Sequence, residues 1–420
     1  MMIETGFETE MSDLVVERGF QTSKWTIGHG GSVVTIGPVK NGVVYLGCCD
    51  SHAYALDAET GKEIWRYKAS GVFGESRPII HENFLLIGNY DGYLYVIDIR
   101  NGRLAWKFKT GNRITASALV YEGKVYIGSW DGYLYVLDFS NGREEARFML
   151  GDKIGAGVLI HKGRMYIGSF DGNFFCLDME GREMWRFRTG GSIFDYRPPT
   201  LHEGRMYVGS YDGYLYCLSP TDGKLFWKFR TGEAVVSSVT IRGNRIYFGS
   251  HDSNAYCIDM DGREIWRFKC GNWVGDVKLI VENGAVYFGS VDSSFYVLDA
   301  DTGKLVWKFR TGGDIWSDAF LHNGLVIFGS WDCHVYGVNA KTGKEVWRFE
   351  TSSKQQSPLD IIDEVIFRPE FAGREPEKAQ DANKYDPFPR INVSESMYSP
   401  IIEYATKDIY GSGKKKYDQI

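Results

Sequence analysis

Several kinds of sequence feature are missing from this 420-residue chain. It has no run of about 18 apolar residues, which a membrane-spanning helix would need. Its first residues carry neither a basic stretch nor an apolar core, so we expect no secretory signal. The formal net charge of −6 argues against a general binder of nucleic acids or anionic membranes. Proline is scarce (11 residues), whereas 50 glycines and 15% aromatic residues favour short strands joined by tight turns.

One phrase recurs along most of the chain at an interval of 40 or 41 residues. Its first mark is an aspartate with an aromatic residue four positions later, and its last is a tryptophan that follows a Gly-Lys or Gly-Arg pair. The eight aspartates are Asp50, Asp91, Asp131, Asp171, Asp212, Asp252, Asp292 and Asp332. The tryptophans are Trp65, Trp106, Trp185, Trp227, Trp266, Trp307 and Trp347, and Ala146 takes this place in the third copy.

Each copy contains four segments with the residue types and period of short strands, separated by good turn formers. One four-stranded sheet cannot bury both of its faces, but eight sheets around an axis cover one another. The repeat therefore predicts an all-β, eight-bladed β-propeller over 23–367, with an N-terminal extension at 1–22 and a C-terminal tail at 368–420. A composite ninth blade built from 23–31 and 357–367 is the alternative.

The repeated residues are expected to have structural roles. We expect the tryptophan to pack flat between neighbouring blades, and the aspartate to hold the turn between the second and third strands. A buried tryptophan replaced by alanine costs about 3–5 kcal/mol. Ala146 therefore predicts either a thinner seam between blades or one that a neighbouring side chain fills.

The phrases LDAETGKEIW (56–65), LDADTGKLVW (298–307) and NAKTGKEVW (339–347) resemble the tryptophan-docking motif of quinoprotein-type propellers. That superfamily includes dehydrogenases that use pyrroloquinoline quinone (PQQ) and BamB-like outer-membrane assembly lipoproteins. The resemblance covers roughly residues 23–350 and implies the fold, while one fold serves many functions.

A PQQ-dependent dehydrogenase is one alternative function, suggested by the adjacent Cys48 and Cys49. The resemblance argues against it, because the vicinal disulfide of those enzymes follows a fourth strand, whereas this pair lies in the turn before the aspartate. Carboxylates occur in the loops that enter first strands, but they form no recognisable ligand set; they are Glu75, Asp195, Asp276, Asp314 and Asp318. Four histidines, His81, His161, His202 and His322, fall on separate blades and cannot share one metal. We therefore expect no catalysis, cofactor or metal, with a small-ligand-binding propeller as a further alternative.

Antiparallel strand order places the loops between blades and the second-to-third-strand turns at one end of the ring. Aromatic residues, arginines and a histidine gather at this end: Tyr90, Trp130, Phe170, Tyr211, His251, Trp331, Arg77, Phe194, Tyr196, Arg197, Trp273 and Trp316. This composition is typical of protein interfaces, so we predict a scaffold that binds a protein or peptide there. The alternative is that several of these rings fold inward and fill the central channel. We expect a monomeric ring within a larger complex, without nucleic-acid or membrane partners.

Cysteine usage points to a compartment. The chain has seven cysteines, an odd number, and Cys176, Cys217 and Cys257 share one position of the repeat, where a small apolar residue would pack. Together with the absence of a signal sequence, this predicts a cytoplasmic protein with mostly free thiols.

Overall fold

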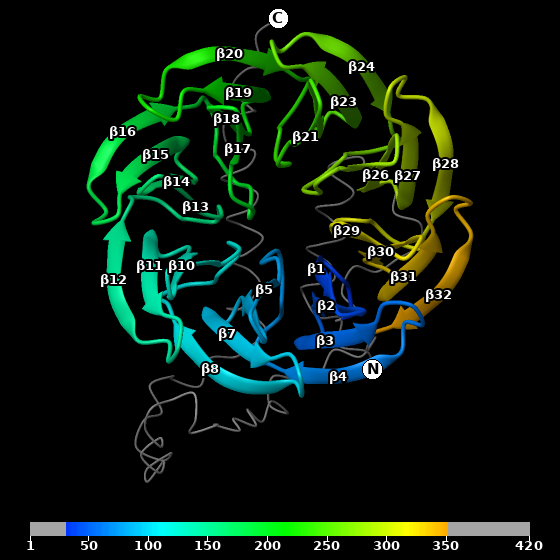
Figure 1. Cartoon of the computed structure of the whole chain (residues 1–420), viewed down its shortest axis with the longest axis horizontal. Coiled ribbons are helices and arrows are strands. Elements are labelled where there is room, and N and C mark those ends of the chain that lie inside the picture. Colours follow the sequence, from blue (N-terminus) through cyan, green and yellow to red (C-terminus); the bar gives the residue numbers. More distant parts are fainter. Residues whose placement is uncertain (1–30, 352–420) are drawn as a thin grey trace, which may run out of the picture.

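The computed structural model describes residues 31–351, which form a closed ring of eight four-stranded antiparallel sheets (Figure 1). Each sheet uses four consecutive strands, so the blades follow one another in sequence order. None of these residues forms a helix, and hence none forms a helix able to cross a membrane. The predicted all-β, eight-bladed propeller is confirmed; the segments 1–22 and 368–420 lie outside the described residues.

Four short strands make up every blade. Blade 1 comprises β1 (Thr35–Lys40), β2 (Val43–Gly47), β3 (His52–Asp57) and β4 (Glu63–Lys68), and blade 2 comprises β5 (Ile79–His81), β6 (Phe84–Gly88), β7 (Tyr93–Asp98) and β8 (Arg103–Lys109). Blade 3 comprises β9 (Leu119–Tyr121), β10 (Lys124–Gly128), β11 (Tyr133–Asp138) and β12 (Glu144–Met149), and blade 4 comprises β13 (Leu159–His161), β14 (Arg164–Gly168), β15 (Asn173–Asp178) and β16 (Glu183–Arg188). Blade 5 comprises β17 (Thr200–His202), β18 (Arg205–Gly209), β19 (Tyr214–Leu218) and β20 (Leu225–Arg230), and blade 6 comprises β21 (Thr240–Arg242), β22 (Arg245–Gly249), β23 (Asn254–Asp259) and β24 (Glu264–Lys269). Blade 7 comprises β25 (Ile280–Glu282), β26 (Ala285–Ser290), β27 (Ser294–Asp299) and β28 (Leu305–Arg310), and blade 8 comprises β29 (Ala319–His322), β30 (Leu325–Ser330), β31 (His334–Asn339) and β32 (Glu345–Glu350).

The first strand of each blade lies near the axis and the fourth forms the rim (Figure 1). The period of two along a strand divides its side chains between the two neighbouring blades. In β11, Leu134 and Val136 join the apolar cluster shared with blade 4, whereas Tyr135 and Leu137 join the cluster shared with blade 2. The core therefore consists of eight layers, one at each seam between blades.

The repeated tryptophan joins its blade to the next one. The indole N–H of Trp227 donates to the carbonyl of Met260 at 3.0 Å, and that of Trp65 donates to Ile99 at 2.9 Å. The Trp227 ring lies against Gly262, whose φ of +82° and whose closeness to the ring both favour glycine, since an added Cβ would lie 2.9 Å from the indole. This contact explains why a glycine comes shortly before each tryptophan position.

The repeated aspartate holds two segments together. In blade 5, Asp212 Oδ1 accepts the backbone N–H of Tyr214 at 3.1 Å, and its Oδ2 accepts the Tyr216 hydroxyl at 2.6 Å. The same Oδ2 accepts the N–H of Gly190, which leaves blade 4, at 2.6 Å. The expected role of the aspartate in its turn is confirmed, and the structure adds a link to the preceding blade.

The seam between blades 3 and 4 lacks the tryptophan but is not empty. The ring of Phe148, two residues after Ala146, lies where the other seams have the indole. An ideal Cβ on Gly181 of blade 4 would lie 2.1 Å from this ring. In the other seams the equivalent glycine faces a tryptophan in the same way. Of the two expectations for Ala146, the filled seam is confirmed.

Blade 8 closes the ring directly on blade 1. The N–H of Val33 donates to Ser330 at 3.1 Å, and the indole of Trp347 donates to Ala58 at 3.3 Å. Residues of both blades share one apolar cluster, which includes Val33, Leu46 and Ile327. The alternative of a composite ninth blade is therefore wrong, because no gap is left for it; 23–30 and 357–367 lie outside the described residues.

Candidate functional site

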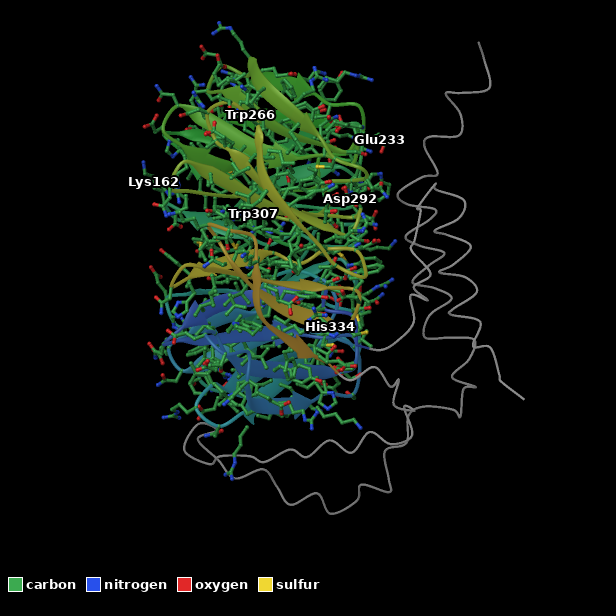
Figure 2. All side chains as sticks on the ribbon, turned by 90° about the vertical axis from the view of Figure 1, so that its right-hand side faces the viewer. Lys162, Glu233, Trp266, Asp292, Trp307 and His334 are labelled. Carbon is green, nitrogen blue, oxygen red and sulfur yellow. The ribbon has the colours of Figure 1, made fainter. Side chains whose placement is uncertain are left out.

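The two ends of the ring differ as the strand order predicted. Figure 2 shows three residues at one end of the ring: Asp292 from a second-to-third-strand turn, His334 from the start of β31 directly after such a turn, and Glu233 from a loop between blades. Lys162, from the turn between β13 and β14, lies at the other end. We call the first the aromatic end and the second the turn end.

A nearly continuous arc of rings runs around the aromatic end from blade 3 to blade 8. Successive ring centroids lie 4.2–6.5 Å apart, within the range of attractive aromatic contact. The aromatic arc consists of Trp130, Phe170, Phe194, Tyr211, His251, Trp273, Trp316 and Trp331. His251 stacks on Trp273 at 4.2 Å, and Trp316 stacks on Trp331 at 5.3 Å. The structure thus brings together side chains from turns of five blades and from three loops between blades.

Tyr90 is connected to this arc through a cation. The guanidinium of Arg113 lies 3.7 Å from the centre of the Trp130 ring and 5.5 Å from that of Tyr90. The hydroxyl of Tyr90 donates to Glu75, whose pKa is raised by burial. Sequence reasoning missed Arg113, which lies in the loop entering blade 3 and is buried.

Exposure divides the candidate residues into two groups. Phe170, Phe194 and His251 are buried, and they form the floor of the arc. The remaining aromatic candidates above this floor are half-buried; they are Tyr90, Trp130, Tyr211, Trp273, Trp316 and Trp331. A small cluster of Phe170, Phe194, Ala234 and Val236 supports the rings of Trp130 and Tyr211 from below. Only the half-buried group presents ring surface that a partner can contact.

Tyr196 and Arg197 cross the ring instead of facing solvent, and each is 2% exposed. They belong to the 190–199 loop between blades 4 and 5. The carbonyl of Tyr196 accepts the N–H of Ser117, which enters blade 3, while its hydroxyl donates to the carbonyl of Asp276, which enters blade 7. Arg197 donates to Asp318, which enters blade 8, through Nη2 at 2.5 Å and Nε at 3.2 Å. For these two residues the channel-filling alternative describes the structure, and their burial leaves no surface for a partner.

Arg77 also approaches Asp318, with Nε 3.3 Å from Oδ2. The sequence held a signal for this convergence. The two 41-residue intervals, Asp50 to Asp91 and Asp171 to Asp212, are those whose loops contain Glu-Ser-Arg-Pro and Asp-Tyr-Arg-Pro. Each extra residue belongs to a loop that extends toward the axis.

The buried acidic groups are held by specific partners, and Arg197 is shared between Asp318 and Asp195. Asp195 binds Arg197 at 3.0 Å and Ser238 at 2.5 Å, and burial raises its pKa to about 6. Burial also raises the pKa of Asp314 to about 7. Asp276 Oδ1 lies 3.2 Å from His251 Nε2. Within residues 31–351, no three His, Cys, Asp or Glu side chains gather as a metal site.

Cys48 and Cys49 lie at the seam of blades 8 and 1, where the aromatic arc ends. Burial is the first cause that raises the pKa of both thiols, so neither is activated as a thiolate. All seven cysteines lie within residues 31–351, and none is in a disulfide.

These features define a class: an eight-bladed propeller with repeat-encoded seams, a plugged axis and one aromatic end. A family model described as "Outer membrane protein assembly factor BamB" matches residues 15–180, 131–213, 171–270 and 251–368. The chain therefore belongs to this family, which confirms the resemblance found in the repeat. A search of curated proteins finds no match.

Two solved structures illustrate the likeness. BamB from Moraxella catarrhalis has a TM-score of 0.59 and 21% identity, over 73% of this chain and 91% of that chain. The computationally designed Ika8 protein has a TM-score of 0.63 and 16% identity, over 77% of this chain and 98% of that chain. At these identities the likeness concerns the fold alone.

Proposed function

We propose that this propeller is a non-catalytic scaffold that binds a protein or peptide through the half-buried rings of the aromatic end. The observation that carries the proposal is the aromatic arc, in which Trp130, Tyr211, Trp273, Trp316 and Trp331 are only half-buried on a buried floor. Tryptophan and tyrosine dominate the binding energy of protein interfaces, especially where the ring is held in place before binding.

The contacts within the arc support this choice of surface. Trp130 is fixed by its N–H donating to Thr115 at 2.8 Å and by Arg113 over its face. Trp331 is fixed by stacking on Trp316. Rings fixed in this way lose little conformational entropy when a partner covers them. The turn end offers mainly glycine turns and solvated charged residues.

A non-catalytic role agrees with the chemistry of the buried groups. A quinone enzyme would require a calcium site and an activated base, but these buried carboxylates are engaged by protein groups: Arg197 binds Asp318 and Asp195, and His251 lies against Asp276. The residues present therefore do not fit PQQ and its calcium ion, and we derive no step through them.

We also propose the cytoplasm as the location. The supporting observation is that seven cysteines, six of them buried, form no disulfide. Fractionation of cells that express the tagged chain tests this, and recovery from a membrane or extracytoplasmic fraction would contradict it.

The experiment for the scaffold uses Trp130→Ala, Tyr211→Ala and Trp331→Ala. Phe226→Ala serves as a matched control, because this aromatic side chain is 54% exposed on the rim strand β20, away from the arc. A partner identified by co-purification with the natural chain is then titrated as a purified protein. We expect the three variants to weaken binding at least about tenfold and the control to leave it unchanged.

Thermal denaturation of the same variants separates interface from core. The scaffold proposal expects midpoints close to that of the natural chain. If all three variants lose several kcal/mol of stability, the rings belong to the core and the interface is not at this end.

A further inference from the structure

The central channel contains a cavity of about 460 Å³ that the proposed scaffold function does not use. Its walls come from the innermost strands of blades 5 to 8, namely β17, β21, β25 and β29. Apolar side chains such as Leu201, Ile241, Val281 and Leu321 line the middle of these walls. This volume lies within the range of small-molecule sites in proteins.

The cavity has one open and one closed end. His202, Arg242 and Glu282 lie where the first strands finish, at the turn end, and they form its mouth. At the aromatic end the 190–199 loop crosses the axis, with Arg197 bound to Asp318. A ligand therefore enters from the face opposite to the aromatic arc.

Basic groups gather at the closed end. Arg77 and Lys278 line the cavity, and Arg197 lies behind them. Arg77 and Arg197 both lie against the carboxylate of Asp318, which also accepts the backbone N–H of Lys278 at 2.9 Å. The nearby positive charges lower the pKa of Asp318, although burial opposes this. Among the charged side chains that line this end of the cavity, Arg77 and Lys278 face the single carboxylate of Asp318, so one positive charge is in excess there; behind them Arg197 also binds Asp195, and Asp276 lies against His251.

The excess charge lies on groups with unused donors. Arg77 Nε lies 3.3 Å from Asp318 without the alignment of a hydrogen bond. Within residues 31–351, no hydrogen bond or ion pair engages the ammonium group of Lys278. Lys278 is exposed to the channel, but partial loss of hydration inside the ring, followed by the charges of Arg197 and Arg77, lowers its pKa, which an anion would reverse. Cations that have lost part of their hydration, like Arg77 and Lys278 in the channel, are stabilised most by a hydrogen-bonded anion.

We propose that the channel is a binding site for a monocarboxylate, whose carboxylate lies between Arg77 and Lys278 and whose apolar part lies against Leu201, Ile241 and Phe320. One negative charge matches the excess, whereas a dianion such as phosphate would be repelled by Asp318. The carboxylate can belong to a small acid or to the C-terminus of a peptide. The site is separate from the aromatic end, so the proposal does not depend on the scaffold function.

Ligand-observed saturation-transfer NMR with the full chain tests this proposal, with hexanoate as the probe. Hexanol and hexylamine share its apolar part and lack its charge. At about 10 mM, a concentration that fills even a millimolar site, we expect a signal from hexanoate and none from the other two. An alanine pentapeptide with a free C-terminus, compared with its amidated form, shows whether a peptide end also enters.

Variants link the signal to the site. Lys278→Met removes the ammonium group but keeps the backbone N–H that binds Asp318, and we expect its Kd for hexanoate to rise about tenfold. Arg77→Gln is the second variant, with the same expectation. Lys162→Met is the control, since this exposed lysine lies outside the channel at the turn end (Figure 2). Unchanged binding in Lys278→Met and Arg77→Gln, or no signal from either hexanoate or the free-acid peptide, overturns the proposal. Trp130→Ala and Trp331→Ala leave hexanoate binding unchanged, which distinguishes this site from the scaffold surface.

Discussion

Replacing Ala146 by tryptophan, the residue found at this position in the other seven blades, is expected to destabilise the protein. Phe148 already fills the space against Gly181, so the new indole has no room unless Phe148 moves. Forcing extra volume into a packed core costs about 1–3 kcal/mol. The consensus residue of the repeat should therefore lower the free energy of unfolding here.

The effect of Ala146→Trp on the free energy of unfolding should change sign once Phe148 is removed. Phe148→Ala alone should cost about 2 kcal/mol, roughly half the value for a fully buried phenylalanine, because the ring is half-buried. In that background Ala146→Trp restores the arrangement of the other seams, with the indole against Gly181, and should regain most of the loss. A double-mutant cycle measured by urea denaturation gives the coupling between the two positions, which we expect to be at least about 2 kcal/mol.

The control is Met184→Trp, which adds an indole to the exposed side of the neighbouring rim strand β16, where the methionine is 49% exposed. This change should stay within about 0.5 kcal/mol of the natural chain. Amide exchange offers a second measurement, and the filled seam predicts similar protection for 143–150, 103–110 and 304–311. If Ala146→Trp stabilises the natural chain, or the two substitutions are additive, Phe148 does not occupy the tryptophan site.

Three further predictions concern the buried charges and the enzymatic alternative. Burial raises the folded-state pKa of Asp314 to about 7, above its unfolded value of about 3.9, so the free energy of unfolding should fall as pH rises from about 4 to about 7. Asp314→Asn should flatten that fall in thermal scans. An unchanged pH profile would contradict the assignment. Arg197→Met leaves Asp318 with less of its counter-charge and should lower the free energy of unfolding, measured by urea denaturation, by about 3–5 kcal/mol. Arg242→Met, at the mouth of the channel, should lower it by less than about 1 kcal/mol. Equal losses of stability would show that Arg197 does not hold the channel closed. Incubation with PQQ and calcium, followed by dye-linked oxidation of alcohols and sugars, should give no turnover, and saturable turnover would establish the enzyme instead.

The sequence by itself determined the features that repeat. The interval of the aspartates indicated eight blades, and the period of two in segments such as 133–138 indicated short strands. The role of Asp212 and its equivalents within their turns was also accessible, because this contact lies within one turn and recurs in every blade, whereas the link to the preceding blade came from the structure. Contacts of this kind recur at a fixed separation, so one chain contains eight examples of the same rule.

Only the tertiary structure decided what happens where the repeat is broken or where blades meet across the axis. Sequence reasoning left two outcomes open for Ala146, because the side chain that fills the gap is chosen by packing and not by the period. It grouped Tyr196 and Arg197 with the partner-binding residues, yet Arg197 binds Asp318, 121 residues away on the far side of the channel. It also did not find the basic closed end of the cavity, which needs Arg77 and Lys278 from different loops. The physical reason is that closing the ring sets which loops face one another, and a contact across the axis follows no interval in the sequence.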